Sequence, residues 1–508
     1  MDVRTPRRDR DPAPTRALRG YAELPGPRGV PVMGNALQMD PPRMHLQVEQ
    51  WCREFGPLFR LTLMGRRLLV VADHEMVAGI LRDRPDGFAR TNRLQQIWTE
   101  LGLAPGVFGA NGEVWKRQRR MVVAGFDPAH VKRYYPSMVA VAQRLSARWH
   151  RAATTGQAID LQPDLMRYTV DTIAGLAFGA QVDTLGTDGD VIQQHLDKIF
   201  PVVYRRLFAA FPLWRWLPSA ADKQLARAVV EVNRAVDGFV AQARARLQAE
   251  PARRAEPPNL LEAMLVAADE PASGIDDQQV AGNVLTMLLA GEDTTANSIA
   301  WMLHLLWRNP ATLARAVAEV QRVVGDTASP TMEQLAQLDH VEACCHETMR
   351  LKPVAPLTAL QTLREVTIGD VVVPEGVVVL NVMRRDSVSD AHLANAAAFE
   401  PERWLADGGT AAQAAASAKR ISMPFGAGPR ICPGRYLALL EMKLAMATLL
   451  RDFEISAVDT PDGGEAAELL QFTMAPVGLS MRLRPRPRGS SAGPLPSRPA
   501  IPSVEGLT

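Results

Sequence analysis

A single cysteine, Cys432, lies in a glycine-rich segment whose residue types could bind a metal. The segment reads Phe-Gly-Ala-Gly-Pro-Arg-Ile-Cys-Pro-Gly over residues 425–434, and an apolar run typical of a helix follows over residues 436–453. The positive end of that helix and Arg430 both favour the thiolate, and Pro433 suits the first helical position because no backbone donor is needed there. No second Cys or His lies at metal spacing, so a soft anionic sulfur suits haem iron better than zinc. The alternative is a buried structural cysteine after a turn.

A group of polar residues interrupts a long apolar helix upstream of the cysteine. Residues 278–309 predict one helix, with Asp276 and Asp277 suiting its first turn and Pro310 ending it. Its middle reads Ala-Gly-Glu-Asp-Thr-Thr over residues 290–295. Buried polar groups are costly unless satisfied, and Gly291 weakens the helix by about 1 kcal/mol relative to alanine, so we expect a functional site here. The alternative is a helix break without chemistry. Small residues leave space beside a flat cofactor, a threonine hydroxyl can hold water, and the adjacent carboxylate can pass protons inward.

Both segments resemble motifs of the cytochrome P-450 family. The cysteine segment matches the family pattern Phe-x-x-Gly-x-Arg-x-Cys-x-Gly at every fixed position, and the helix matches Ala/Gly-Gly-x-Asp/Glu-Thr-Thr, which crosses the distal face of the haem in that family. The resemblance extends from about residue 24 to residue 484. It implies heme b (iron protoporphyrin IX) with Cys432 as axial ligand, Thr294 in oxygen activation and Asp293 in proton relay. Thr295 is expected to be structural, and Glu292 to lie in solvent or in a salt bridge.

Further residues resemble the family's contacts to the haem propionates. Trp115 and Arg119, four residues apart on one helix face, match the family's Trp-x-x-x-Arg motif, and Arg430 should bind another propionate. Many members have an Arg or His in a later strand where this chain has Gln361, so that contact is either missing or made by Gln361. The resemblance thus implies a cofactor-binding set of Trp115, Arg119, Ala290, Gly291, Phe425 and Arg430.

Three charged residues resemble the structural network of the family. Glu347 and Arg350 form a Glu-x-x-Arg pattern, which alone usually indicates a solvated pair on one helix face. The resemblance makes them a buried pair joined by Arg403, and such a network is stable only if it is fully hydrogen-bonded. These residues are expected to be structural and not catalytic.

The segments that line the substrate pocket in the family are apolar in this chain, which suits a hydrophobic substrate. No Arg or Lys is clearly placed to hold a substrate carboxylate. Each residue could equally belong to the core. Besides Ala290, the expected lining residues are Ile97, Trp98, Leu101, Leu103, Val354, Ala355, Leu357, Thr358, Phe472 and Met474.

The pattern along the chain predicts a mainly α fold with small peripheral β-sheets. We expect a helix over residues 44–55, strands over 58–63 and 67–71, mostly helices over 73–350, and short strands over 366–368, 371–373, 454–457 and 479–483. The resemblance places the haem between the long distal helix and the helix after Cys432. Residues 23–484 are expected to form the catalytic domain. Residues 1–22, rich in Arg and Pro, and residues 485–508, rich in Pro and Ser, are expected to be disordered tails.

Composition restricts the partners and the compartment. A net charge of +2 gives no reason to expect nucleic-acid binding. Four cysteines without a disulfide pattern fit a reducing cytoplasm, and no apolar stretch of 18 or more residues opens the chain, so we expect no membrane anchor. The segment from Phe211 to Leu217 mixes aromatic residues with a cation. It suits either packing against the domain or peripheral contact with a membrane.

These observations predict a soluble, monomeric haem-thiolate monooxygenase. It would use O2 and two electrons to hydroxylate or epoxidise a lipophilic small molecule such as a fatty acid, terpenoid or other secondary metabolite. A separate ferredoxin or flavodoxin-type donor would supply electrons and dock near Cys432, where Arg435, Lys443 and the Trp115 helix carry charge. One alternative is a peroxide-driven or isomerising haem-thiolate enzyme, which the Asp293-Thr294 pair disfavours. Another is a haem-binding sensor without turnover.

Overall fold

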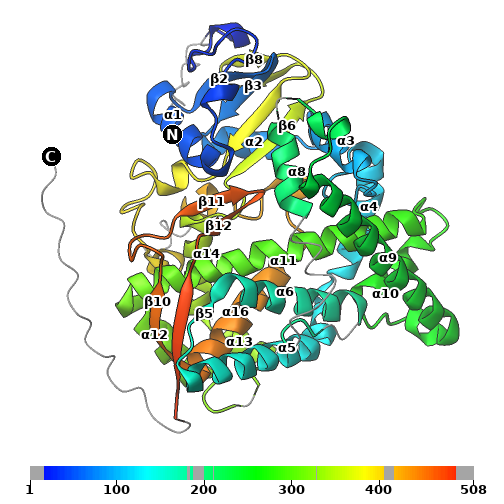
Figure 1. Ribbon diagram of the computed structural model, residues 1–508, viewed down its shortest axis with the longest axis vertical. Helices are drawn as coiled ribbons and strands as arrows, with labels where there is room; N and C mark the ends of the chain where they lie inside the picture. The colour runs from blue at the N-terminus through cyan, green and yellow to red at the C-terminus, as the bar shows by residue number, and fades with distance from the viewer. Residues whose placement is uncertain are drawn as a thin grey trace, which may run out of the picture.

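The computed structural model describes residues 17–179, 183–186, 199–209, 211–327, 329–405 and 417–487. Helices form most of the molecule, and the small sheets lie toward its edge (Figure 1). The α-helices are α1 (Met44–Phe55), α2 (His74–Arg82), α3 (Asn92–Glu100), α4 (Gly112–Gly125), α5 (Pro128–Thr155), α6 (Leu161–Phe178), α8 (Ile199–Phe208), α9 (Ala220–Ala249), α10 (Leu260–Ala268), α11 (Asp277–Arg308), α12 (Pro310–Val323), α13 (Met332–Ala336), α14 (Asp339–Leu351) and α16 (Arg435–Asp452).

The strands form four small sheets among the described residues. The largest has the order β2-β3-β9-β6-β4, and β3 and β9 in it are parallel. The others have the orders β1-β8-β7, β10-β13-β5 and β11-β12. The strand bounds are β1 (Arg19–Gly20), β2 (Leu58–Leu63), β3 (Arg66–Val71), β4 (Phe88–Ala89), β5 (Ile159–Asp160), β6 (Leu357–Thr362), β7 (Val366–Ile368), β8 (Val371–Val373), β9 (Val378–Val382), β10 (Phe453–Asp459), β11 (Glu468–Gln471), β12 (Thr473–Pro476) and β13 (Ser480–Pro485).

The helix α11 forms the central rod of the molecule and crosses it from one side to the other (Figure 1). It spans 32 residues and begins with a capping box, in which the Asp276 side chain accepts from the Gln279 N–H and the Gln279 side chain accepts from the Asp276 N–H. Helix α6 packs closely along it, because a Cβ atom at Gly291 would lie only 2.5 Å from Ile173 Cγ1. Asn309 ends the helix before Pro310, as expected. None of the helices in the described part of the chain is long and apolar enough to span a membrane.

The expected fold class is confirmed, and the domain boundaries need adjustment. Arg19 pairs with Val371 in a sheet and forms an ion pair with Asp370, and Tyr21 is buried. The residues from 19 to 22 therefore belong to the folded domain and not to a tail. At the other end, β13 continues to Pro485, and the Arg486 N–H donates to the Asp452 carbonyl oxygen. Residues 1–16 and 488–508 of the expected tails lie outside the described residues.

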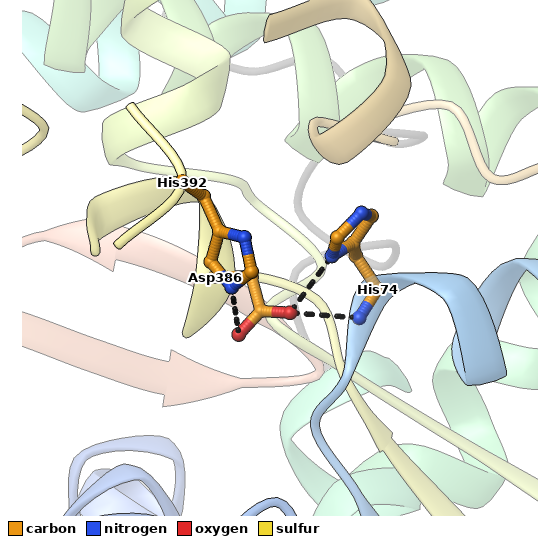
Figure 2. Close-up of side chains that lie close together, drawn as sticks. All are labelled: His74, Asp386 and His392. Carbon is orange, nitrogen blue, oxygen red and sulfur yellow. Dashed lines mark hydrogen bonds and ion pairs between the residues drawn. The ribbon is translucent and has the colours of Figure 1, made fainter. Parts of the chain in front are cut away.

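A buried carboxylate, Asp386, fixes the start of α2 (Figure 2). Its Oδ2 accepts from the His74 N–H at 2.8 Å and lies 2.9 Å from His74 Nδ1. Its Oδ1 accepts from Arg385 at 2.7 Å and lies 3.6 Å from His392 Nε2. Because these donors satisfy the carboxylate, we interpret the cluster as a structural contact that stabilises the start of α2. It matters for the site because the other end of α2 supports the cysteine loop.

Candidate active site

A cavity of about 480 Å³ lies between α11 and the loop before α16. Cys432 lines it from the loop, and Thr294 lines it from the helix. The structure therefore brings together the two segments, about 140 positions apart, that the sequence singled out. The predicted residues that line this cavity are Trp98, Trp115, Arg119, Ala290, Gly291, Thr294, Val354, Ala355, Leu357, Thr358, Phe425, Arg430, Cys432 and Phe472.

The cysteine loop is closed by its own backbone and supported by α2. The Cys432 N–H donates to the Phe425 carbonyl oxygen at 2.9 Å, so the thiol is held at the mouth of the loop. Gly428 has φ +69°, and a Cβ atom there would lie 2.5 Å from the Leu81 carbonyl oxygen at the end of α2. Only glycine allows this approach. Helix α16 begins at Arg435, so Pro433 precedes the helix and does not occupy its first position.

The surroundings of Cys432 differ in one respect from the expectation. Burial raises the pKa of the thiol above its ordinary value, although the Gly434 N–H and the charges of Arg119 and Arg435 oppose it. The contacts of Arg430 lie elsewhere. Its guanidinium stacks on Trp115, 4.6 Å from the ring centre, and donates to the Ala110 carbonyl oxygen. A bound iron would supply the missing positive charge, because metal coordination deprotonates a thiol.

The polar notch of α11 faces the cavity through Thr294. The Thr294 hydroxyl donates to the Ala290 carbonyl oxygen at 2.7 Å, which leaves its oxygen lone pairs to accept from a group in the cavity. The Ala290 side chain is exposed to this space. Gly291 lines the cavity, and its missing side chain also allows close contact with Ile173 of α6. The helix is continuous through the notch.

The two acidic residues of the notch lie away from the cavity wall. Asp293 Oδ2 accepts from the Thr473 hydroxyl at 2.7 Å, and Thr473, which lines the cavity, also accepts from Asn297 at 3.3 Å. A polar link therefore joins Asp293 to the cavity through Thr473. Glu292 is 3% exposed, so the expectation that it lies in solvent is wrong. Its carbonyl oxygen accepts from Thr169 of α6.

Glu441 is a cavity residue that the sequence reasoning missed. It lies on α16, nine residues after Cys432, and is 1% exposed. Burial raises the pKa of its carboxyl to about 8, against a smaller opposing effect of Thr295, so the group is protonated at neutral pH. Thr295 also lines the cavity. A charged residue in the apolar face of the α16 sequence was the available signal.

Arginine side chains form part of the cavity wall. Trp115, Arg119 and Arg430 line it as expected, and Arg119 also donates to the Ile431 carbonyl oxygen at 2.6 Å. Two arginines that the sequence reasoning did not select, Arg84 and Arg90, line it as well. In the described part of the chain, Arg84 Nε and Nη2 and Arg430 Nε are buried without a hydrogen-bond partner.

These features fit an iron porphyrin with two carboxylates. Buried guanidinium nitrogens need an anion, most of the other lining side chains are apolar, and the lining includes both the Cys432 thiol and the Thr294 hydroxyl. Four cations line the cavity, whereas Glu441 is its one acidic lining residue in the described part of the chain.

Part of the predicted pocket lining is wrong. Ile97, Leu103 and Met474 are at most 2% exposed and pack in the hydrophobic core, and Leu101 packs against that core from outside. None of these four lines the cavity. Neighbouring residues of a helix or strand point in different directions, and the sequence could not indicate which of them face the cavity. The lining residues found instead include Leu94, Phe108, Tyr204, Phe208, Leu285 and Leu289.

The predicted buried charge network is present. Arg350 donates to both oxygens of Glu347, at 2.8 and 2.7 Å, and Arg403 donates to Glu347 Oε1 at 2.9 Å. Trp404 and the Glu400 N–H complete the coordination of the carboxylate. Burial alone would raise the pKa of Glu347, but Arg350 and Arg403 hold it below its ordinary value. Arg350 also donates to the carbonyl oxygens of Ser387, Ala396 and Ala398.

Comparison with known proteins agrees with this geometry. A family model described as Cytochrome P450 matches residues 24–481. The protein LUTEIN DEFICIENT 5, chloroplastic, of Arabidopsis thaliana is 27% identical over 78% of this chain and 67% of its own length. The cytokinin hydroxylase of Arabidopsis thaliana is 25% identical over 87% of this chain and 84% of its own length. The self-sufficient cytochrome P450 monooxygenase CYP505E5 of Aspergillus niger is 26% identical over 94% of this chain, which spans only 46% of that protein.

The fold matches solved structures as well. The crystal structure of the cytochrome P450DA heme domain superposes with a TM-score of 0.78 at 26% identity, covering 93% of this chain and 99% of that one. The sequence motifs, the family match over most of the chain and the cavity between Cys432 and Thr294 agree, and the chain belongs to the cytochrome P450 family.

Proposed function

We propose that this protein is a haem-thiolate monooxygenase that inserts one oxygen atom of O2 into a lipophilic small molecule by hydroxylation or epoxidation. The observation that carries the proposal is the single cavity that Cys432 lines from the loop before α16 and Thr294 lines from α11. The test is turnover of candidate lipophilic substrates by haem-loaded protein with O2, NAD(P)H and a ferredoxin or flavodoxin system. Product that forms only with hydrogen peroxide would favour the peroxide-driven alternative.

The residues that would hold heme b have distinct tasks. Cys432 would bind the iron, and Trp115, Arg119 and Arg430 would bind the carboxylates of the haem. When bound, a thiolate-ligated haem supplies O2 activation and cleavage of the O–O bond. Ala290, whose side chain is a single methyl group, leaves the distal side open, and the apolar lining excludes water from the reacting centre.

Thr294 and Asp293 would control the supply of protons. The Thr294 oxygen can hold a water molecule in the cavity, because its own proton is donated to the helix backbone. Asp293 can exchange protons with the cavity through the Thr473 hydroxyl. Thr294 and Asp293 lie on α11, and Thr473 lies on β12.

Replacement of Thr294 by alanine should uncouple electron use from product formation. NAD(P)H oxidation should continue, and hydrogen peroxide should be released. The amount of product per electron pair should fall about tenfold or more, because the hydroxyl that would hold the proton-supplying water is lost. Thr172→Ala is the matched control, since Thr172 on α6 makes the same type of bond, to the Tyr168 carbonyl oxygen at 2.8 Å, outside the cavity lining. Unchanged coupling in Thr294→Ala would contradict the role given to Thr294.

A hydrophobic substrate is favoured by the composition of the cavity wall. Apart from its four arginines, the polar side chains of α11 and the carboxyl group of Glu441, the wall consists mainly of aromatic and aliphatic side chains. These come from α3, α8, α11 and β6. Such a wall binds through burial of apolar surface and offers few orienting contacts. We propose a fatty acid, terpenoid or other secondary metabolite. A screen of such compounds for a change of iron spin state measures binding directly, and binding of only small polar compounds would contradict this class.

A separate electron donor would dock on the face beside the cysteine loop. Lys116, Arg120, Arg435 and Tyr436 are exposed there. Lys443, expected to contribute, is 5% exposed and donates to Glu342 at 2.6 Å, so it is not part of this face. Basic side chains attract an acidic partner and accelerate its association. The rate of electron transfer should therefore fall steeply as salt increases, and a salt-independent rate would contradict this docking mode.

The segment over residues 211–217 is proposed to touch a membrane surface. Phe211, Leu213, Trp216 and Leu217 are between 58% and 76% exposed, whereas Trp214 is held against the domain by Glu100. The segment follows α8, which lines the cavity through Tyr204, Leu207 and Phe208.

Serine at both Trp216 and Leu217 should lower binding to phospholipid vesicles at least about tenfold in a cosedimentation assay, since two large apolar side chains are lost from the contact. Val230→Ser, at an exposed valine on α9, is the control. If the wild type, the double serine variant and Val230→Ser bound the vesicles equally, the segment would not contact the membrane.

We propose a cytoplasmic monomer. The support is that the four cysteines are free and that Cys52, Cys344 and Cys345 are buried thiols, which fits a reducing compartment. Cell fractionation and light scattering would test these two points, and recovery in an organelle or as a stable dimer would contradict them.

A further inference from the structure

Arg84 is a buried cation, and its hydrogen bonds within the protein do not compensate for its burial. It is 5% exposed, and in the described part of the chain its Nε and Nη2 have no hydrogen-bond partner. Removing a guanidinium from water without an opposite charge is expensive. Its side chain lines the cavity that also contains Cys432. An anion that enters this cavity would supply the missing partner.

We propose that Arg84 binds a carboxylate of the haem, as part of a propionate site that the sequence motifs of the family do not include. This inference rests on the proposed haem-dependent function and adds a residue to its cofactor site.

The surroundings of Arg84 favour a ligand with more than one negative charge. Burial has the largest effect on the pKa of Arg84, which it lowers. The nearby charges of Arg90 and Arg430 lower this pKa further, and together these effects bring it to about 8. Arg90 Nε donates to the Phe108 carbonyl oxygen at 3.1 Å, and Arg430 donates to Ala110, so each is partly occupied by backbone. Arg84 keeps its nitrogens for a ligand. A dianionic porphyrin would relieve the repulsion among the three cations.

The position of Arg84 fills a gap left by another residue. Gln361, expected as a substitute contact to a propionate, does not line the cavity, and its Oε1 accepts from the Asn92 N–H at 3.2 Å. Arg84 comes two residues after the end of α2, and the Leu81 carbonyl in that helix touches the cysteine loop at Gly428. The helix α2 would therefore hold both the iron-ligand loop and a propionate contact.

A substrate carboxylate is the other source of the same chemistry, and one experiment distinguishes the two. Haem-loaded wild type, Arg84→Gln and Arg84→Lys are mixed with excess apomyoglobin, and the rate of haem loss is followed by absorbance. Arg82→Gln is the control, because Arg82 is exposed on α2. A second series uses protein reconstituted with iron protoporphyrin IX dimethyl ester, in which both carboxylates are blocked. Fatty-acid affinity is measured on the same variants.

We expect Arg84→Gln to lose haem about tenfold faster than wild type or more, since a charge-assisted hydrogen bond is lost, with Arg84→Lys between them and Arg82→Gln unchanged. With the dimethyl ester, Arg84→Gln and wild type should lose the porphyrin at equal rates. Arg84→Lys keeps the charge, so it provides the same comparison if Arg84→Gln does not fold.

Haem loss from the Arg84 variants at the wild-type rate would overturn the inference. If fatty-acid affinity alone fell, Arg84 would bind a substrate carboxylate. A difference that persisted with the dimethyl ester would indicate a structural role. Failure of the wild type to take up haem would instead overturn the proposed function.

Discussion

Replacement of Cys432 by serine should abolish monooxygenase turnover, with a loss of at least about a thousandfold, while the fold is retained. The bond from Cys432 to the Phe425 carbonyl oxygen is made by the backbone N–H, which serine keeps. A serine hydroxyl is a poor ligand for iron and does not supply the electron density that promotes O–O cleavage. Haem content and product formation are measured on the same preparation.

A matched control separates loss of the iron ligand from loss of a thiol. Cys345→Ser alters a fully buried thiol on α14 whose sulfur lies 3.7 Å from Met302 Sδ. We expect this variant to be somewhat less stable but to keep its turnover. Cys432→Ser with near wild-type turnover would remove Cys432 from the mechanism.

Replacement of Arg350 by methionine should give little or no folded, haem-containing protein. Glu347 and Arg350 are both 0% exposed, and the change leaves one side of the Glu347 carboxylate and three carbonyl oxygens without their donor. Breaking a buried pair by removing one partner costs about 3–5 kcal/mol, which is a large part of the stability of a typical protein. The measurement is the free energy of unfolding, or the yield of soluble holoprotein where unfolding is irreversible.

Two further variants make this prediction specific. Arg350→Lys should rescue little, because one ammonium cannot replace a guanidinium that donates to Glu347 and to three carbonyl oxygens. Arg315→Met removes a surface pair with Glu402, whose side chains are about half exposed, and should change stability by less than about 1 kcal/mol. If Arg350→Met were as stable as Arg315→Met, the network would not support the fold.

The functional segments that the sequence predicted well are short runs of consecutive residues. The cysteine loop and the notch of α11 each consist of consecutive residues, so their composition alone indicates a site. The helix Met44–Phe55 and the strands Leu58–Leu63, Val366–Ile368 and Val371–Val373 were also predicted at their observed bounds, because their patterns are long or strongly apolar.

What the sequence could not show depends on tertiary contacts. Arg84 lies in a charged segment that looks solvent-exposed, yet the folded chain buries it beside the cavity. Thr473 becomes relevant to proton supply because the β11–β12 hairpin lies beside α11. The solvent alternative for Glu292 is wrong because helical position alone does not show that α6 covers that side of α11. Strands such as β1 and β4 have two residues each and exist only through their partners.

The absorbance spectrum of the purified, haem-loaded wild type after reduction and addition of carbon monoxide tests the central claim most directly. Iron held by the sulfur of Cys432 predicts the strongly red-shifted band that gave this family its name. A band at the position typical of nitrogen-ligated haem, or protein that takes up no haem, would contradict the account.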